Sequence, residues 1–119
     1  MTRTTAFFVA ALVALALAAS AAAMGTATKL VGTDGPAFTI TLKKGSTKVK
    51  TLKHGKYTLV VHDRSSLHNF HLTGPGVRNV KTGVKFVGTK TYTITLKRGT
   101  YTYVCDPHKA AMHGTFHVT

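Results

Sequence analysis

Beyond about residue 28 the chain is a succession of short segments in which apolar and polar residues alternate, separated by turns rich in Lys and Gly. A period of two puts every second side chain on the same face of a β-strand, so each segment predicts a half-buried strand. No segment has a convincing helical period. The segments with the alternating pattern are 38–42, 56–61, 92–96, 101–105 and 115–118. The sequence therefore predicts an all-β sandwich or barrel.

The same alternation predicts which side chains face the core. Phe38, Ile40 and Leu42 share one face of the first of these strands. Tyr101 and Tyr103 share a face of the strand 101–105. Cys105 follows them at the same spacing, so its side chain is expected to point inward where that strand ends.

An internal echo relates two parts of the chain at a constant offset of 44 residues. Residues 51–61 match residues 95–105, and each copy reads as a strand end, a Gly turn and a new strand. One explanation is convergence on a favourable turn, because Gly recurs wherever strands reverse through a left-handed position. The other is that both copies are equivalent corners of a two-sheet sandwich, in which case His68 and Cys105 lie at the same end.

The first residues of the chain do not share the β pattern. Arg3 is followed by an uninterrupted apolar run, Ala6 to Ala19, and then by small residues. This pattern predicts a signal peptide, residues 1–23, and export to the periplasm or the cell exterior. The alternative is a membrane anchor, which is disfavoured because the run falls short of the roughly 20 apolar residues that span a bilayer. Residues 24–119 are then expected to form a single domain without stable membrane insertion.

The expected mature chain is strongly basic. Without Arg3 it has fifteen Lys and Arg against three Asp and no Glu, which is a net charge of +12. Such a field speeds encounter with acidic proteins or anionic envelope surfaces, and salt weakens it. Nucleic-acid binding is disfavoured, because the lysines are scattered through turns and strand edges and are not gathered beside aromatic side chains.

Cys105 is the only cysteine, and it opens the stretch Cys-Asp-Pro-His-Lys-Ala-Ala-Met. A single cysteine in an exported chain cannot form an internal disulfide, which leaves an intermolecular bridge, a reactive thiol or a metal ligand. His108 lies three residues beyond it, and Met112 four residues beyond His108. A thiolate, an imidazole and a thioether on one loop favour a metal ligand, and this set of soft and borderline donors suits copper.

A trigonal copper site of this kind needs a second imidazole. His68, which is followed by Asn69, is the best candidate. Its alternative role is that of a core histidine, because alternation places it on an apolar strand face together with Phe70 and Leu72. His71 has the opposite parity and is expected at the surface.

The axial position of such a site has two candidate donors. Met112 is the first, and its alternative role is simple core packing, since Met readily fills irregular gaps. His113 is the rival axial donor.

The chain resembles the plastocyanin and pseudoazurin group of small cupredoxins. The residues that carry the resemblance are Cys105, Pro107, His108, Met112 and Gly114, the Tyr-Thr-Tyr-Val strand before them, and the upstream pair His68-Asn69. It covers most of residues 29–119 and implies a cupredoxin-like Greek-key β-sandwich. One departure is the His-to-Met spacing of four, which is a residue shorter than in typical plastocyanins.

The resemblance also implies roles for single residues. Cys105, His68 and His108 would bind one copper ion in a near plane, with Met112 as the long axial ligand. Asn69 would tie the two ligand-bearing segments together. By the same resemblance, one ring edge of His108 would lie near solvent as the exit for the electron.

An apolar docking patch is a further implication of the resemblance. It would lie beside the exposed ring edge of His108 and consist of Pro107, Ala110 and Ala111.

These features predict an exported blue copper protein, a monomer that carries single electrons between redox partner proteins, which are expected to be acidic. The alternative is a copper-binding homeostasis or carrier protein of the cell envelope, which is disfavoured because the remaining histidines are spread out and only one useful Met is present. A copper-free interaction domain would leave the ligand set unexplained. Enzyme activity is not expected, because the chain has only three acids and no recognisable carboxylate pair, Ser-His-Asp set or phosphate loop.

Overall fold

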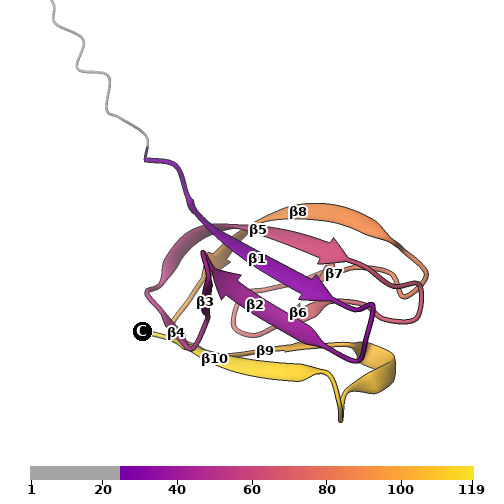
Figure 1. The fold of residues 1–119 in the computed structure, drawn as a ribbon. Helices are drawn as coiled ribbons and strands as arrows, with labels where there is room; N and C mark the ends of the chain where they lie inside the picture. Colours follow the sequence, from indigo (N-terminus) through magenta and orange to yellow (C-terminus); the bar gives the residue numbers. More distant parts are fainter. Residues whose placement is uncertain (1–24) are drawn as a thin grey trace, which may run out of the picture.

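The computed structural model describes residues 25–119, which form two five-stranded β-sheets (Figure 1). The expected signal peptide, residues 1–23, lies outside the described residues. The first sheet has the order β3-β2-β1-β5-β8, with β1 Thr28–Asp34, β2 Ile40–Lys44, β3 Thr47–Lys48, β5 Gly55–Asp63 and β8 Gly88–Leu96. The second has the order β4-β10-β9-β6-β7, with β4 Thr51–Leu52, β6 His71–Thr73, β7 Val80–Lys81, β9 Gly99–Val104 and β10 His113–Val118.

Half of the neighbouring strand pairs are not consecutive in the chain. β1 pairs with β5 and β4 with β10 in parallel, and the other pairs are antiparallel. Figure 1 shows the two sheets facing each other as the layers of a sandwich. The predicted all-β, cupredoxin-like Greek-key sandwich is confirmed. Among the described residues, no helix is long and apolar enough to cross a membrane.

The core fills the space between the two sheets with the side chains that alternation predicts. Tyr101 and Tyr103 of β9 are fully buried. Tyr101 stacks on Phe116 with ring centroids 5.2 Å apart, and Tyr103 stacks on Phe70 at 5.7 Å. Aromatic side chains of this size bury about 150–250 Å² each, so these four rings dominate the packing.

The two copies of the internal echo are both corners of the sandwich. The corner between β4 and β5 crosses from the second sheet to the first, and the corner between β8 and β9 crosses back. Gly55 and Gly99 begin the new strands with φ angles of 145° and 142°, which residues with a Cβ rarely adopt. Since β5 is antiparallel to β8, the two corners lie at one end of the sandwich, and β5 and β9 both run from there to the opposite end. The explanation of the echo as equivalent corners is therefore confirmed.

Candidate metal centre

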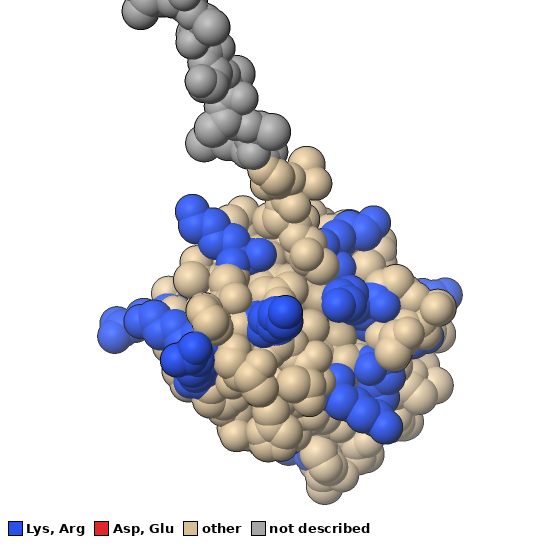
Figure 2. All heavy atoms as spheres, turned by 90° about the vertical axis from the view of Figure 1, so that its left-hand side faces the viewer, with Lys and Arg blue, Asp and Glu red and all other residues tan. Residues whose placement is uncertain are grey.

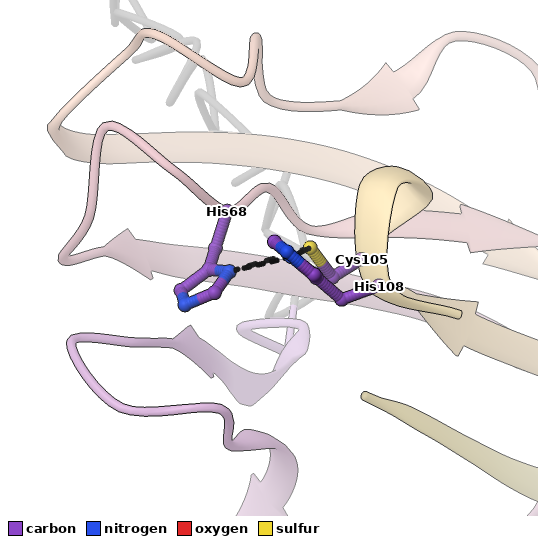
Figure 3. Close-up of side chains that lie close together, drawn as sticks. All are labelled: His68, Cys105 and His108. Carbon is purple, nitrogen blue, oxygen red and sulfur yellow. Dashed lines mark hydrogen bonds between the residues drawn. The ribbon is translucent and has the colours of Figure 1, made fainter. Parts of the chain in front are cut away.

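The end of the sandwich toward which β5 and β9 run carries the predicted ligands. Cys105 directly follows β9, and a single turn of 3₁₀-helix, η1 (Asp106–His108), places His108 next to it. His68 comes from the connection between β5 and β6. Figure 3 shows the side chains of His68, Cys105 and His108 pointing toward one another. The structure therefore brings together the three residues that were expected to lie in the plane of the site.

The three donor atoms form a compact triangle. The Nδ1 atoms of His68 and His108 are 3.0 Å apart, and Cys105 Sγ lies 3.7 Å and 3.6 Å from them. A point equidistant from the three atoms is about 2.0 Å from each, close to the roughly 2.0–2.3 Å of transition-metal bonds to N and S. The residues present thus fit one metal ion, with a thiolate and two imidazoles as donors.

Burial of the donors is graded from the interior to the surface. Cys105 is completely buried, and His68 is only 2% exposed. His108 is half-buried. Because both imidazoles present Nδ1 to the triangle, the Nε2 edge of the half-buried ring is the part of the donor set nearest to solvent. This agrees with the solvent-facing ring edge that the resemblance implies for His108.

Backbone hydrogen bonds close the ligand loop on itself. The N–H of His108 donates to the carbonyl of Cys105 at 3.1 Å, and the N–H of Met112 donates to the carbonyl of His108 at 2.8 Å. The N–H of Cys105 donates to the carbonyl of Met112 at 3.0 Å. Pro107, at the start of η1, fixes its own φ within this turn. The loop is therefore held by hydrogen bonds of its own backbone.

Asn69 connects three separate segments, as the resemblance implies. Its Oδ1 accepts a hydrogen bond from the N–H of Asp106 at 2.7 Å. Its Nδ2 donates to Asp106 Oδ2 at 2.8 Å and to the carbonyl of Thr82 at 3.1 Å. Because the side chain is only 2% exposed, water cannot replace these bonds, and the segments that carry His68 and Cys105 are fixed relative to each other.

His71 also braces the ligand loop, although the sequence predicts a surface position for it. It is half-buried, and its Nδ1 donates to Asp106 Oδ1 at 2.9 Å. Partial burial works to raise the pKa of Asp106, but the hydrogen bonds from His71 and Asn69 and the positive charge of Lys109 outweigh it and lower that pKa. The parity argument failed because β6 begins only at His71, so the residues before it are not in a strand.

The same error affects the expected surroundings of His68. It lies in a connection and not on a strand face, and His68, Asn69 and Phe70 are all buried in succession. Period-two alternation does not apply where the backbone leaves the sheet, so the choice between ligand and core histidine had to come from the structure.

Met112 and its rival differ in where their side chains go. Met112 is completely buried, and its backbone is hydrogen-bonded to Cys105. His113 is exposed, and its Nδ1 donates to the carbonyl of Lys109 at 2.8 Å. This arrangement favours the thioether over the imidazole as an axial donor.

Phe38 is a part of the site that the sequence did not predict. Alternation places it in the core with Ile40 and Leu42, but it is 61% exposed, because β2 begins only at Ile40. Its ring packs edge-on against both imidazoles, with centroids 5.0 Å from His68 and 4.9 Å from His108. The signal that could have shown this is Gly35-Pro36, which interrupts a strand pattern just before it.

The ligand loop and Phe38 together present exposed apolar side chains near His108, which form an apolar rim. We use this name for the exposed residues Phe38, Pro107, Ala110 and Ala111. The last three are the patch that the resemblance implies, and Phe38 extends it from the other side of the two rings.

The sequence predicts no carboxylate pair, and this prediction is wrong. Asp34 and Asp63 are register partners at the ends of β1 and β5, with side chains 0% and 2% exposed. Burial, together with the neighbouring Asp63 carboxyl, raises the pKa of Asp34 to about 7. Because the Asp34 side chain has no access to solvent, the pair is a buried feature of the sandwich.

Comparison with known proteins agrees with this geometry. A profile of copper-binding proteins of the plastocyanin/azurin family matches residues 38–119. No curated protein sequence gives a significant match. Among solved structures, reduced rusticyanin is 24% identical with a TM-score of 0.55 over 80% of this chain and 81% of that one. Rusticyanin from Thiobacillus ferrooxidans is 25% identical with a TM-score of 0.50 over 80% and 79%.

The family profile spans most of the chain and includes all the residues that the donor triangle and its supports contribute. The structural likeness is to a protein whose solved structures are described as those of a copper protein. His68, Cys105 and His108 form the corresponding group for one copper ion. The chain therefore belongs to the plastocyanin/azurin family of copper-binding proteins.

Proposed function

We propose that this chain is an exported blue copper protein that carries single electrons between partner proteins through one type 1 copper site. The observation that carries the proposal is the triangle of Cys105 Sγ and the Nδ1 atoms of His68 and His108, which has the dimensions of a single metal site. When bound, copper supplies the one-electron chemistry, because it is stable as both Cu(I) and Cu(II). Met112 is proposed as the axial ligand.

The chain's own contribution is a donor set that needs little rearrangement. The loop 105–112 is closed by its backbone hydrogen bonds, and Asn69 fixes it to the segment of His68. Rigid support of this kind keeps first-shell ligands in one geometry whichever charge the site carries. Burial of Cys105 excludes water from the thiolate.

The apolar rim is the proposed contact surface for redox partners. His108 is the half-buried donor at its centre, so a partner that covers the rim comes close to the site. A contact surface of this small size suits short-lived complexes that must form and separate quickly. The exposed cations Arg64, Lys81 and Lys85 at this end of the sandwich support acidic partners, which positive charge attracts.

A copper carrier without an electron-transfer role is the alternative. It is less well supported, because the donor set is buried and braced, whereas an ion that must be handed on needs accessible ligands. A catalytic role has no support from the family, and we propose that the protein is not an enzyme.

The test is to add one equivalent of Cu(II) to residues 24–119 and record the visible and EPR spectra. We expect an intense visible absorption that reductant bleaches and reoxidation restores, and that is lost in Cys105→Ser. Met112→Gln should keep the copper but change its colour and reduction potential. The matched control is His113→Gln, which should change neither, because that ring faces solvent.

Two outcomes would contradict the proposal. A pale product would mean that copper binds only to histidines. Loss of the ion at each reduction would instead support the carrier. Export is tested separately by expressing the full chain in a bacterium and determining the N-terminus of the protein recovered outside the cytoplasm. A terminus near residue 24 supports the signal peptide, and a retained Met1 contradicts it.

A further inference from the structure

The end of the sandwich opposite the metal centre carries most of the positive charge. At this end lie the start of β1, β4, both corners of the echo and the turns that join β2, β3 and β4. Its exposed cations, which we call the basic end, are Lys29, Lys43, Lys44, Lys48, Lys50, Lys53, Lys56, Lys97 and Arg98. Figure 2 shows this end with Lys and Arg spread across it and no Asp or Glu in view.

The negative side chains lie elsewhere. The chain has only three acids, and Asp34, Asp63 and Asp106 are all at the metal end. The basic end therefore has no acidic side chain to neutralise it. β5, of nine residues, joins the two ends and spans about 26 Å at roughly 3.3 Å per residue. This exceeds the Debye length of about 8 Å at physiological salt, so the ends act as separate electrostatic surfaces.

We propose that the basic end binds the anionic headgroups of a lipid membrane and leaves the metal end free for redox partners. The inference goes beyond electron transfer and does not depend on bound copper. Binding of this kind needs several Lys or Arg spread over a surface, and each cation adds to the attraction.

The kinds of side chain exposed at the basic end favour a membrane over another anionic partner. The large hydrophobic side chains that are exposed in residues 25–119 are Phe38, Leu67, Val84 and Val87, and none of them is at the basic end. A specific protein interface would need such anchors at its centre. Single-stranded nucleic acid would need exposed aromatic rings for stacking. A surface of cations without exposed large apolar side chains instead suits lipid headgroups, which the protein can bind without inserting into the bilayer.

The position of the N-terminal side supports the same partner. Residues 25–27 are exposed and enter β1 at the basic end (Figure 1). If residues 1–23 are the expected signal peptide, the basic end is the part of the described chain that lies nearest to it, and so nearest to the membrane during export.

The experiment measures sedimentation of residues 24–119, which contain both sheets and the whole core, with vesicles. One set is phosphatidylcholine alone, and the other contains about one-third phosphatidylglycerol. We expect binding only to the anionic vesicles, and release when salt is raised to about 0.5 M. The copper-free and copper-loaded proteins should bind alike.

Matched charge reversals locate the surface. The triple variant Lys48→Glu, Lys53→Glu, Arg98→Glu should weaken binding at least about tenfold, since each cation near the surface contributes a factor of about five. The control triple Arg64→Glu, Lys81→Glu, Lys85→Glu lowers the net charge equally but at exposed positions near the metal end. It should weaken binding less than about threefold.

Two results would overturn the inference. Equal losses in the two triple variants would mean that net charge alone is responsible. No binding to anionic vesicles at low salt, together with retention on a soluble polyanion such as heparin, would assign the basic end to a different partner. Because all six positions are exposed, we expect every variant to fold, and circular dichroism checks this. Replacing the same residues with Gln instead of Glu repeats the comparison with half the change in charge.

Discussion

The two ends of this sandwich differ in how the chain turns. At the basic end, Lys53-His54 and Lys97-Arg98 join strands through corners of two residues. At the metal end, the connections 64–70 and 105–112 are long enough to fold back over the core and bury their own polar groups. Short corners leave charged side chains in solvent, whereas long connections can bring donors from distant segments together. The comparison shows that the donors come from the two long connections at the metal end and not from the strands.

The largest effect should come from breaking a corner at the basic end. Gly99→Ala puts a Cβ at φ 142° and 2.9 Å from Pro75 Cγ, and we expect a loss of about 3 kcal/mol in the free energy of unfolding. The matched change Gly55→Ala has the same backbone strain, at φ 145°, but meets no atom within 4 Å. It should cost about 1–2 kcal/mol.

Urea denaturation of both glycine variants measures the difference, which isolates the contact with Pro75. Since the corners are far from the donors, the copper spectrum should not change in either variant. A changed spectrum would show that the two ends are not independent.

At the metal end, Asn69→Ala should have the next largest effect. It leaves the Asp106 N–H without its partner in a site with little water, at a cost of about 2 kcal/mol. The loop 105–112 should also loosen, so copper should dissociate faster to a chelator. His71→Ala is the comparison, because it removes a partner of Asp106 that is only half-buried, and its effect should be smaller. Equal chelation rates for wild type and Asn69→Ala would count against the bracing role.

The buried carboxyls of the metal end should give the protein a particular pH dependence. The pKa of Asp34 is about 7 in the folded chain and 3.8 as an ordinary value, so between these pH values the folded state binds the extra proton. Stability should therefore fall as pH rises from about 4 to about 7 and level off above. Asp34→Asn, which mimics the neutral acid, should flatten this slope in urea titrations.

Asp106 provides the contrast in sign. Its pKa is lowered in the folded chain, so its contribution is present above the ordinary value and is lost as pH falls below it. Asp106→Asn should therefore lower stability at neutral pH and make little difference in strong acid, where the contribution is already lost. If the two Asn variants changed the pH profile in the same window, the assignment of the two shifts would be wrong.

The smallest effect on stability should come from Phe38→Ala. The side chain is mostly exposed, so we expect a loss below about 1 kcal/mol. Its contact with both imidazole rings predicts a larger effect on the site, namely faster copper loss and a shifted reduction potential. Leu67→Ala removes an equally exposed apolar residue as the control, and it should leave the reduction potential unchanged.

The strands were predictable where alternation is regular. Tyr101, Tyr103 and Cys105 are buried as the period of two indicates, because β9 is a continuous strand on the core. β1 was not predicted as a strand, since Gly32 and Asp34 interrupt its apolar pattern even though both are buried. β8 begins at Gly88, four residues before the predicted segment, because exposed threonines and lysines hide its start. Backbone pairing, which has no side-chain signature, extends these strands.

What the sequence by itself determined is the class of fold and the chemistry of the ligand loop. A single Cys, a His three residues on and a Met beyond it are local features, and local spacing is enough to identify soft donors that suit copper. What only the tertiary structure decided is which distant groups join them. The sequence indicated His68 as the second imidazole, but its approach to Cys105 depends on contacts between segments far apart in the chain. The position of Phe38, the buried pair of Asp34 and Asp63, and the segregation of the lysines from the acids depend on such contacts too, because they follow from sheet register and loop packing that no local pattern encodes.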